Sequence, residues 1–405
     1  MKMKSFAMAA ALSVMASAAA ADCGFENDTE VSMLSAGFEA WKAVTDAMAE
    51  CGNVQAELDQ EFRTKQPSAF AANPSLYTLG GVSNGTVTPL LNAGTIRPLD
   101  DLVEKYGQNL SPNQLIRVNG EIMAIAMMVN TQHLMYRADI FEDLGLDVPT
   151  TWSEVLEAAE AIEAAGVVEY PLGATMKTGW NLAQDFNNYF LGYGGEFFEA
   201  DGVTPNVDGL AGLNTLTQMS AMTEFMDPEY LVSDSTYVQQ QFQQGKIAMA
   251  NLWASRAGAM DDEAESQVVG QVAMAAAPSA VPGGKPSSTL WWDGIVVAAN
   301  ITDAQADAAF RVAMEGLDED MVTANNDAAV WLVNGYQPGR LAEGAIATAT
   351  MGTAPYPSST QMGLMHTALG NNVADYLTGA KSAKAVLESI EADYITAARE
   401  AGLIE

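Results

Sequence analysis

The chain is poor in cysteine, histidine and basic residues. Only two cysteines, two histidines and 18 Lys and Arg residues occur among 405 residues, against 51 Asp and Glu residues, so the net charge is −33. A surface this acidic repels nucleic acid and anionic lipid, so we expect neither as a partner. His133 and His366 stand apart from any metal-ligating pattern of Cys, Asp or Glu, so no metal site or cofactor is expected. We interpret the acidity as a solvated surface suited to a salty medium rather than a metal-attracting one.

Long apolar runs are missing except near the start of the chain. Lys2 and Lys4 precede a mostly apolar stretch, and residues 19–21 form an A-x-A cleavage site. This pattern predicts a secretory signal peptide at residues 1–21, cleaved after Ala21, and therefore a periplasmic location. A lipid-anchored protein would have a small residue directly before its first mature cysteine, and an aspartate stands there. No later segment reaches the roughly 18 consecutive apolar residues that a membrane helix needs.

The two cysteines fall at the same end of a predicted strand–helix–strand unit. Residues 31–34 and 54–58 read as strands around a helix at 38–50, with Cys23 before the first strand and Cys51 after the helix. Export permits a disulfide between them, and closing this loop would stabilise the fold by about 3 kcal/mol. The alternative, a catalytic or metal-binding thiol pair, lacks a nearby histidine. We therefore predict a structural disulfide.

Strand and helix patterns alternate along the rest of the chain. Residues 121–129 are almost entirely apolar, which is typical of a strand covered on both faces. Thr151 and Glu154 predict a capping box that starts a helix, and the apolar stripe of this helix ends at Gly166. We predict an α/β fold with mostly parallel sheets flanked by helices.

Four segments resemble one family of binding proteins. Residues 119–162 run from a buried strand through a polar turn to a short helix and a Pro-Thr-Thr-Trp helix start. Residues 242–253 read FQQGKIAMANLW, which is similar to an F-x-x-G-K-x-A-M…W signature. Residues 94–100 end in Pro-Leu-Asp after a glycine, and residues 335–340 form a loop of the x-P-x-R type. Together they resemble the extracellular solute-binding proteins of ABC importers, family 1, the sugar-binding, maltose-binding-protein-like type.

The resemblance implies a two-lobe periplasmic binding protein fold, type II-like, with the lobes joined by crossover segments. The expected N-terminal lobe comprises residues 22–129 plus 279–330, and the expected C-terminal lobe comprises residues 130–278 plus 331–405. The implied function involves no chemistry. A monomeric protein would capture a mono- or oligosaccharide between its lobes and deliver it to the permease subunits of an ABC importer.

Sugar binding requires hydrogen-bonding groups for the hydroxyls and flat apolar partners for the C–H faces. Such groups are expected beyond the C-terminal ends of parallel strands and near the crossovers. The residues that meet these conditions are Phe38, Glu61, Ser83, Asn84, Asn130, Trp180, Trp253, Trp291, Trp292, Asp293, Tyr336 and Arg340.

The tryptophans differ in what their surroundings predict. Trp41 and Trp152 lie within helical apolar stripes and are predicted to be core residues. Trp253 ends a strand, so a stacking platform and a core position are equally open. Trp291 and Trp292 are adjacent, so one is expected to face the cleft and the other the interior.

Several alternatives stay open on the sequence alone. Asp293 could accept from a ligand hydroxyl or serve a turn, and Arg340 could bind ligand or form a surface ion pair. The ligand could be a polyol, a glycerol phosphate or a polyamine, although the acidic balance disfavours phosphate. A secreted glycoside hydrolase needs two carboxylates across a cleft. Among 51 acidic residues some such pair will always be available, so this feature does not distinguish a hydrolase from a binding protein. A structural or adhesive protein would more often show repeats, and none is visible.

Overall fold

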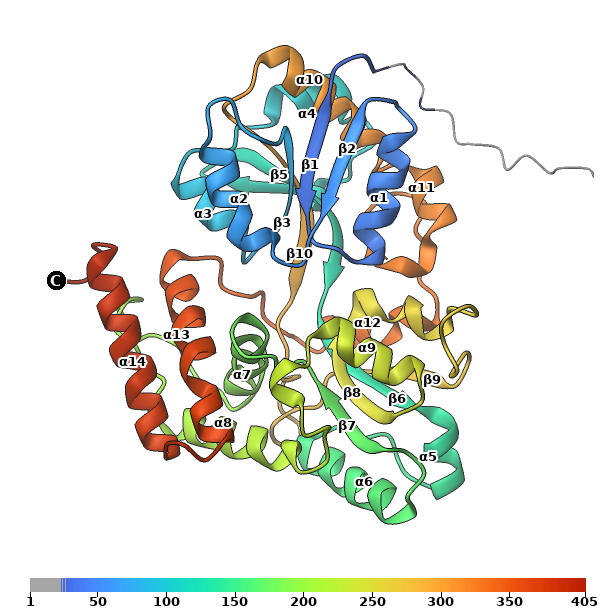
Figure 1. Cartoon of the computed structure of the whole chain (residues 1–405), viewed down its shortest axis with the longest axis vertical. Helices are drawn as coiled ribbons and strands as arrows, with labels where there is room; N and C mark the ends of the chain where they lie inside the picture. Colours follow the sequence, from blue (N-terminus) through green and yellow to red (C-terminus); the bar gives the residue numbers. More distant parts are fainter. Residues whose placement is uncertain (1–22, 24, 26) are drawn as a thin grey trace, which may run out of the picture.

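The computed structural model describes residues 23, 25 and 27–405, which form two lobes, each around its own β-sheet (Figure 1). The predicted signal peptide and its cleavage site lie outside the described residues. Strands flanked by helices in both lobes confirm the predicted α/β class. Within the part of the chain that the structure describes, no helix is long and apolar enough to cross a membrane.

The first lobe, at the top of Figure 1, is built on a seven-stranded sheet. The strand order is β11-β5-β10-β3-β1-β2, and β4 pairs with β5. The strands are β1 (Val31–Ser35), β2 (Val54–Leu58), β3 (Leu79–Ser83), β4 (Leu115–Val118), β5 (Glu121–Asn130), β10 (Trp291–Val297) and β11 (Val330–Trp331). The helices of this lobe are α1 (Glu39–Ala49), α2 (Phe62–Ala71), α3 (Val87–Asn92), α4 (Asp100–Tyr106), α10 (Asp303–Glu315) and α11 (Glu319–Ala324). Trp41 on α1 is 1% exposed, which confirms its predicted core position.

The second lobe contains a four-stranded sheet in the order β7-β8-β6-β9. The strands are β6 (Gln132–Arg137), β7 (Tyr170–Ala174), β8 (Ile247–Trp253) and β9 (Val272–Ala275). The helices are α5 (Ala138–Leu144), α6 (Trp152–Ala165), α7 (Trp180–Gly192), α8 (Leu210–Thr223), α9 (Ser235–Gln243), α12 (Glu343–Thr350), α13 (Thr360–Leu377) and α14 (Ala383–Glu400). Helix α6 has the predicted capping box between Thr151 and Glu154, and its C-cap is Gly166 in the left-handed conformation. Trp152 on this helix is a core residue, as predicted, with 1% of its surface exposed.

The sheets are mixed rather than mostly parallel, which corrects the sequence-based expectation. Among the described strands, β1–β2, β1–β3 and β7–β8 pair in parallel, and the other six pairings are antiparallel. One reason is a hairpin between β4 and β5, where Asn119 and Gly120 both adopt positive φ, the signature of a two-residue hairpin turn. A second reason is that β10 enters the first sheet when the chain returns from the other lobe, and both β10 and β11 pair antiparallel with their neighbours.

The chain passes between the two sheets at three places. β5 ends at Asn130 and β6 begins at Gln132 in the other sheet, the chain returns between β9 and β10, and it leaves again after β11. Thr131 Oγ1 lies 2.7 Å from Ser288 Oγ, so the first two connecting segments lie side by side. The lobe boundaries expected after residues 129, 278 and 330 remain proposals.

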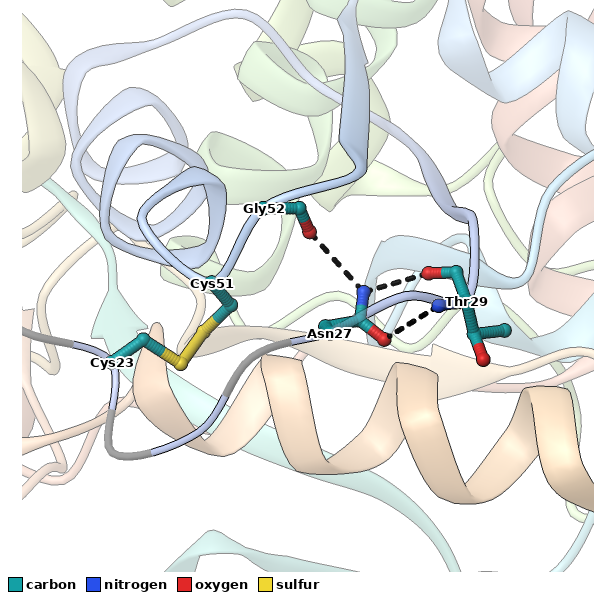
Figure 2. Close-up of a disulfide and its surroundings, with 5 residues drawn as sticks. All are labelled: Cys23, Asn27, Thr29, Cys51 and Gly52. Atoms are coloured by element: carbon teal, nitrogen blue, oxygen red, sulfur yellow. Dashed lines mark hydrogen bonds between the residues drawn. A yellow bond between two sulfur atoms is a disulfide. The ribbon is translucent and has the colours of Figure 1, made fainter.

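A disulfide joins Cys23 to Cys51, as predicted, with Cα atoms 5.0 Å apart (Figure 2). Beside it, the Asn27 side chain donates to the carbonyl of Thr29 at 2.7 Å and to that of Gly52 at 3.2 Å. The backbone N–H of Asn27 also donates to the carbonyl of Cys51 at 3.1 Å. The segment that precedes β1 is therefore held against the end of α1.

Candidate ligand-binding site

A cavity of about 420 Å³ lies between the two lobes. The first lobe lines it with the loops after β1 and β2, the start of α2 and the ends of β3, β5 and β10. The second lobe lines it with the starts of α7 and α9 and the end of β8. The lining residues are Ala36, Phe38, Gln60, Glu61, Phe62, Arg63, Thr64, Ser83, Asn130, Trp291 and Asp293 from the first lobe and Lys177, Thr178, Gly179, Trp180, Asn181, Asp234, Ser235, Trp253, Ser255 and Arg256 from the second.

Three tryptophans form the apolar wall of this cavity. The rings of Trp180 and Trp253 stack with centroids 6.4 Å apart, and Trp291 meets them edge-on at 5.6 and 5.8 Å. Tyr356 stacks on Trp291 with a centroid distance of 4.1 Å. Flat apolar rings of this kind suit the C–H faces of a sugar or polyol.

The local structure explains where these rings stand. Trp253 is the last residue of β8 and Trp291 the first of β10, so both lie where a strand meets the space between the lobes. Trp180 is the first residue of α7 and follows Gly179, whose φ of 96° is accessible mainly to glycine. The Gly179 N–H donates to the carbonyl of Gly370 at 3.2 Å, which anchors this turn to α13.

A buried histidine supports the wall from behind. His366 Nε2 lies 2.9 Å from the Trp180 carbonyl oxygen, and its Nδ1 lies 2.9 Å from Tyr356 Oη. Burial lowers the pKa of His366 to about 4, so the ring is neutral at pH 7 and acts through hydrogen bonds.

Within residues 23, 25 and 27–405, no group of three or more His, Cys, Asp or Glu side chains is placed to hold a metal ion.

Arg63 brings a positive charge into the cavity from the first turn of α2. Its guanidinium carbon lies 4.2 Å from the centroid of Trp180 and 4.9 Å from that of Phe62. Burial lowers the pKa of Arg63 to about 10, and the nearby carboxylates of Asp293 and Glu61 oppose this shift. The Nε atom is buried without a hydrogen-bond partner in the described structure. A ligand hydroxyl or carboxylate could complete the hydrogen bonding of this group.

Asp293 is the buried acid of the site. Burial raises its pKa to about 7, and both the charge of Arg63 and a hydrogen bond from Asn130 oppose the rise. In the sheet, Asp293 stands opposite Ser83 of β3. Asn130 also reaches the second lobe, since its Nδ2 donates to Ser255 Oγ at 3.2 Å and its Oδ1 accepts from the Ser255 N–H at 3.3 Å.

The second lobe adds two further cations. Lys177 Nζ lies 3.5 Å from the Asp234 carboxylate, and Arg256 donates to Ser235 Oγ at 3.3 Å and to Gln239 Oε1 at 3.1 Å. Burial lowers the pKa of Arg256 to about 10, with the charge of Asp234 opposing. The Arg256 guanidinium also lies 5.9 Å from the ring of Phe38 in the first lobe.

Eight of the twelve residues selected from the sequence line this one cavity. They are Phe38, Glu61, Ser83, Asn130, Trp180, Trp253, Trp291 and Asp293. Of the adjacent tryptophans, Trp291 therefore lines the cavity, whereas Trp292 packs against the apolar cluster on the other face of the first sheet.

The other three residues lie outside the cavity wall for identifiable reasons. Asn84 donates to the backbone carbonyls of Leu290 and Tyr356, at 3.3 and 3.4 Å, and thereby fixes a turn. Tyr336 packs against the core of the first lobe. Arg340 forms an ion pair with Asp261 and donates to a backbone carbonyl of β9, so the alternative of a surface ion pair holds for it.

Sequence reasoning missed every basic residue of the cavity. No motif marks Arg63, Lys177 or Arg256. Each follows a strand or begins a helix, and only the sheet topology shows that these positions face one cavity. One signal was available, because Arg63 lies two residues after Glu61 in a chain with only 18 basic residues.

The comparison with family models decides the class of protein. Residues 35–314 match the model of the bacterial extracellular solute-binding proteins. The chain belongs to this family. The resemblance seen in the sequence is thereby confirmed, and the role of this family is solute binding and not catalysis. Its family is extracellular or periplasmic.

Solved structures share the two-lobe fold. An ABC transporter solute-binding protein from Agrobacterium radiobacter K84 in complex with ribitol has a TM-score of 0.80 and 22% identity, covering 91% of this chain and 98% of that one. A D-mannitol-bound protein from Agrobacterium vitis S4 has a TM-score of 0.78 and 19% identity, with 92% and 99% covered. Maltose-bound MalE3 of T. maritima has a TM-score of 0.77 and 19% identity, with 91% and 99% covered. At these identities the likeness shows the fold alone.

Curated relatives match shorter stretches. The sn-glycerol-3-phosphate-binding periplasmic protein UgpB of Agrobacterium fabrum is 28% identical over 137 residues, which is 31% of this chain and 29% of that protein. UgpB of Brucella abortus is 26% identical over 213 residues, 46% of this chain and 44% of that protein. The chain thus spans less than half the length of the curated relatives it matches.

Proposed function

We propose that this solute-binding protein captures a sugar or polyol between its lobes and delivers it to the permease of an ABC importer. The observation that carries the proposal is the wall of Trp180, Trp253 and Trp291, which shares one interlobe cavity with the hydrogen-bonding side chains of Arg63 and Asp293. Sugars and polyols require this combination of flat apolar surface and polar groups. A cavity of about 420 Å³ also falls in the usual range for small-molecule sites.

The charges of the cavity support an uncharged ligand. Three cations and three carboxylates line it, namely Arg63, Lys177, Arg256, Glu61, Asp234 and Asp293. Lys177 already pairs with Asp234, and the charge of Arg63 interacts with those of Asp293 and Glu61. A phosphate dianion would have to displace these pairings, whereas hydroxyl groups can bond to the pairs as they stand.

Glycerol phosphate is the second candidate ligand. The curated relatives are named for it, and the unpartnered Nε of Arg63 could contribute to a forked contact with a phosphate. Binding of glycerol 3-phosphate in preference to polyols would reverse the proposed order of the two candidates.

Capture would proceed through closure of the lobes. A ligand in the cavity touches both lobes in the closed state but fewer groups when they separate, so it shifts the population toward closure. The closed form would then dock on the permease. In this proposal the protein acts in the periplasm as a monomer after removal of residues 1–21.

A thermal-shift screen of residues 22–405 tests the proposal. The panel comprises ribitol, D-mannitol, maltose, monosaccharides, glycerol 3-phosphate, amino acids and polyamines. A ligand at about 100 times its dissociation constant should stabilise the protein by about 2.7 kcal/mol. We expect a shift with a sugar or polyol recovered unchanged, and a shift only with amino acids or polyamines would refute the carbohydrate proposal.

A further inference from the structure

The indole of Trp291 is held by a hydrogen bond away from the cavity. Its Nε1 donates to Thr289 Oγ1 at 2.8 Å, and Thr289 is 1% exposed. The same hydroxyl accepts from Gln184 Nε2 at 2.9 Å and donates to Asn188 Oδ1 at 3.1 Å. The ring therefore has an apolar face in the cavity wall and a polar edge bonded to buried Thr289, whose hydroxyl bonds in turn to Gln184 and Asn188 on α7.

These bonds continue across the second lobe to a buried carboxyl group. Asn188 Nδ2 donates to Gln132 Oε1 at 2.6 Å, and Gln132 Nε2 donates to Asp185 Oδ1 at 3.0 Å. Thr175 Oγ1 donates to the same oxygen at 3.1 Å. We call these side chains the Thr289 network; its members are Gln132, Thr175, Gln184, Asp185, Asn188 and Thr289, each at most 1% exposed.

The network joins β6 and α7 of the second lobe to the segment that connects β9 to β10. Gln132 begins β6 directly after the first connecting segment, and Thr289 lies in the second. The two segments are themselves bonded, since Ser288 Oγ donates to the Gln132 carbonyl at 2.7 Å and Thr131 Oγ1 donates to the Thr289 carbonyl at 3.0 Å. Helix α7 supplies the remaining amides, and its first residue is Trp180 of the cavity wall.

A buried polar network of this kind contributes more to a unique arrangement than to stability. Apolar side chains of the same size would fill the space without a desolvation cost, but they would not fix the orientation of an indole edge. Asp185 Oδ2 has no partner in the described structure, and burial raises the pKa of Asp185 to about 7, so its carboxyl group is partly protonated near neutral pH. The hydrogen bonds of the network therefore fix the orientation of the Trp291 indole.

We propose that Thr289 and Asp185 are positioning residues, which act through the Thr289 network to hold Trp291 in the orientation that binds ligand and to couple it to the connecting segments. The affinity part of this inference rests on the proposed function. The positional part concerns the protein without ligand and can be tested separately.

The first experiment compares Thr289→Val with Thr289→Ser. The valine variant keeps the volume and removes the acceptor, so we expect the affinity for whichever of ribitol, D-mannitol and maltose binds to fall about tenfold. The serine variant keeps the hydroxyl and should bind within about twofold of the wild type. Asp185→Asn retains an acceptor oxygen and should likewise bind nearly as the wild type does, whereas Asp185→Leu should lose affinity. Unchanged affinity in Thr289→Val would overturn the proposal.

A double-mutant cycle separates positioning from a general loss of structure. If Thr289 acts through the indole N–H, Thr289→Val should have almost no effect in a Trp291→Phe background, because phenylalanine cannot make this bond. An equal loss in both backgrounds would show that Thr289 acts independently of Trp291. Thr45→Val is the matched control: Thr45 is a buried threonine of α1 that bonds only within its own helix, and its loss should leave affinity unchanged.

An NMR measurement tests the positional part without ligand. The indole ¹⁵N–¹H signal of Trp291, assigned through Trp291→Phe, should exchange slowly with solvent in the wild type and at least tenfold faster in Thr289→Val. Equal exchange in both proteins would overturn the proposal. Should the wild type bind none of the three probes, the proposed function fails and this exchange measurement alone decides the inference.

Discussion

Arg63 and Trp180 touch across the space between the lobes. The guanidinium carbon of Arg63, on α2 of the first lobe, lies 4.2 Å from the ring centroid of Trp180, the first residue of α7 in the second lobe. A cation over an indole face at this distance is attractive, and the attraction is strongest where water is excluded. The contact exists only while the lobes are close together, so it favours the closed arrangement and places a donor beside the apolar wall.

Replacing Arg63 by methionine should weaken ligand binding at least tenfold. Methionine keeps much of the apolar stem but loses the guanidinium, whose Nε is buried without a hydrogen-bond partner in the described structure. Isothermal titration with the ligand found in the thermal-shift screen measures the effect. Arg97→Met is the matched control, because Arg97 pairs with Asp303 on the surface of the first lobe. Equal losses in the two variants would contradict a specific role for Arg63.

Trp253→Ala should lower both affinity and stability. Trp253 lines the cavity, and it is also only 8% exposed and belongs to the second-lobe core. We therefore expect an affinity loss of at least tenfold together with a loss of about 3 kcal/mol of unfolding free energy. Trp152→Ala, in the same core but away from the cavity, should lose stability and keep its affinity when both are measured well below the melting temperature.

The adjacent residues Trp291 and Trp292 should give opposite results. Trp291→Ala removes part of the cavity wall, so binding should fall by more than tenfold. Trp292→Ala changes the opposite face of the sheet and should leave the dissociation constant within about twofold, with some loss of stability. Fluorescence titration of both variants checks the assignment, and a binding defect confined to Trp292→Ala would reverse it.

Asp293 should make the free energy of unfolding fall as the pH rises. The folded pKa of about 7 lies above the unfolded value of roughly 3.9, so the folded protein binds the proton more tightly between these values. The stabilisation is fully present below about pH 4 and is lost as the pH approaches and passes 7. In urea unfolding, the wild type should therefore lose more stability than Asp293→Asn between pH 5 and pH 8. Asp185→Asn serves as the second variant, because burial raises the pKa of Asp185 in the same direction.

Much of the fold could be predicted because it depends on local patterns. The capping box at Thr151, the apolar strand at residues 121–129 and the family segments are all readable from consecutive residues, and the structure has each of them. The relative direction of the strands was harder to predict, because it depends on where β10 and β11 enter the first sheet, far along the chain from the strands they pair with. The Asn119–Gly120 sequence is a local signal of a hairpin and therefore of an antiparallel pair. The alternation of strand and helix patterns favoured parallel strands instead.

The part of the site that is formed by residues at strand ends could be predicted from the sequence. Residues such as Ser83 and Asn130 were found because a strand that ends at the cleft places its last side chains there. The choice between Trp291 and Trp292 was not accessible, since the face of β10 is set by its register with β5, where Trp291 stands opposite Asn130. Arg63 was missed because its role arises from Trp180, more than a hundred residues away in the sequence.

Strand β10 has a consequence for the order in which the protein can assemble. It lies between β3 and β5, so it alone connects the β1–β2–β3 part of the first sheet to the β4–β5–β11 part. Residues 31–130 can therefore form neither a continuous sheet nor a complete core by themselves. The first lobe, although it contains β1, can be finished only after residues 291–297 have been made. An exported chain would thus keep its first lobe incomplete until all four strands of the second-lobe sheet have been synthesised, a state suited to passage through a membrane before folding.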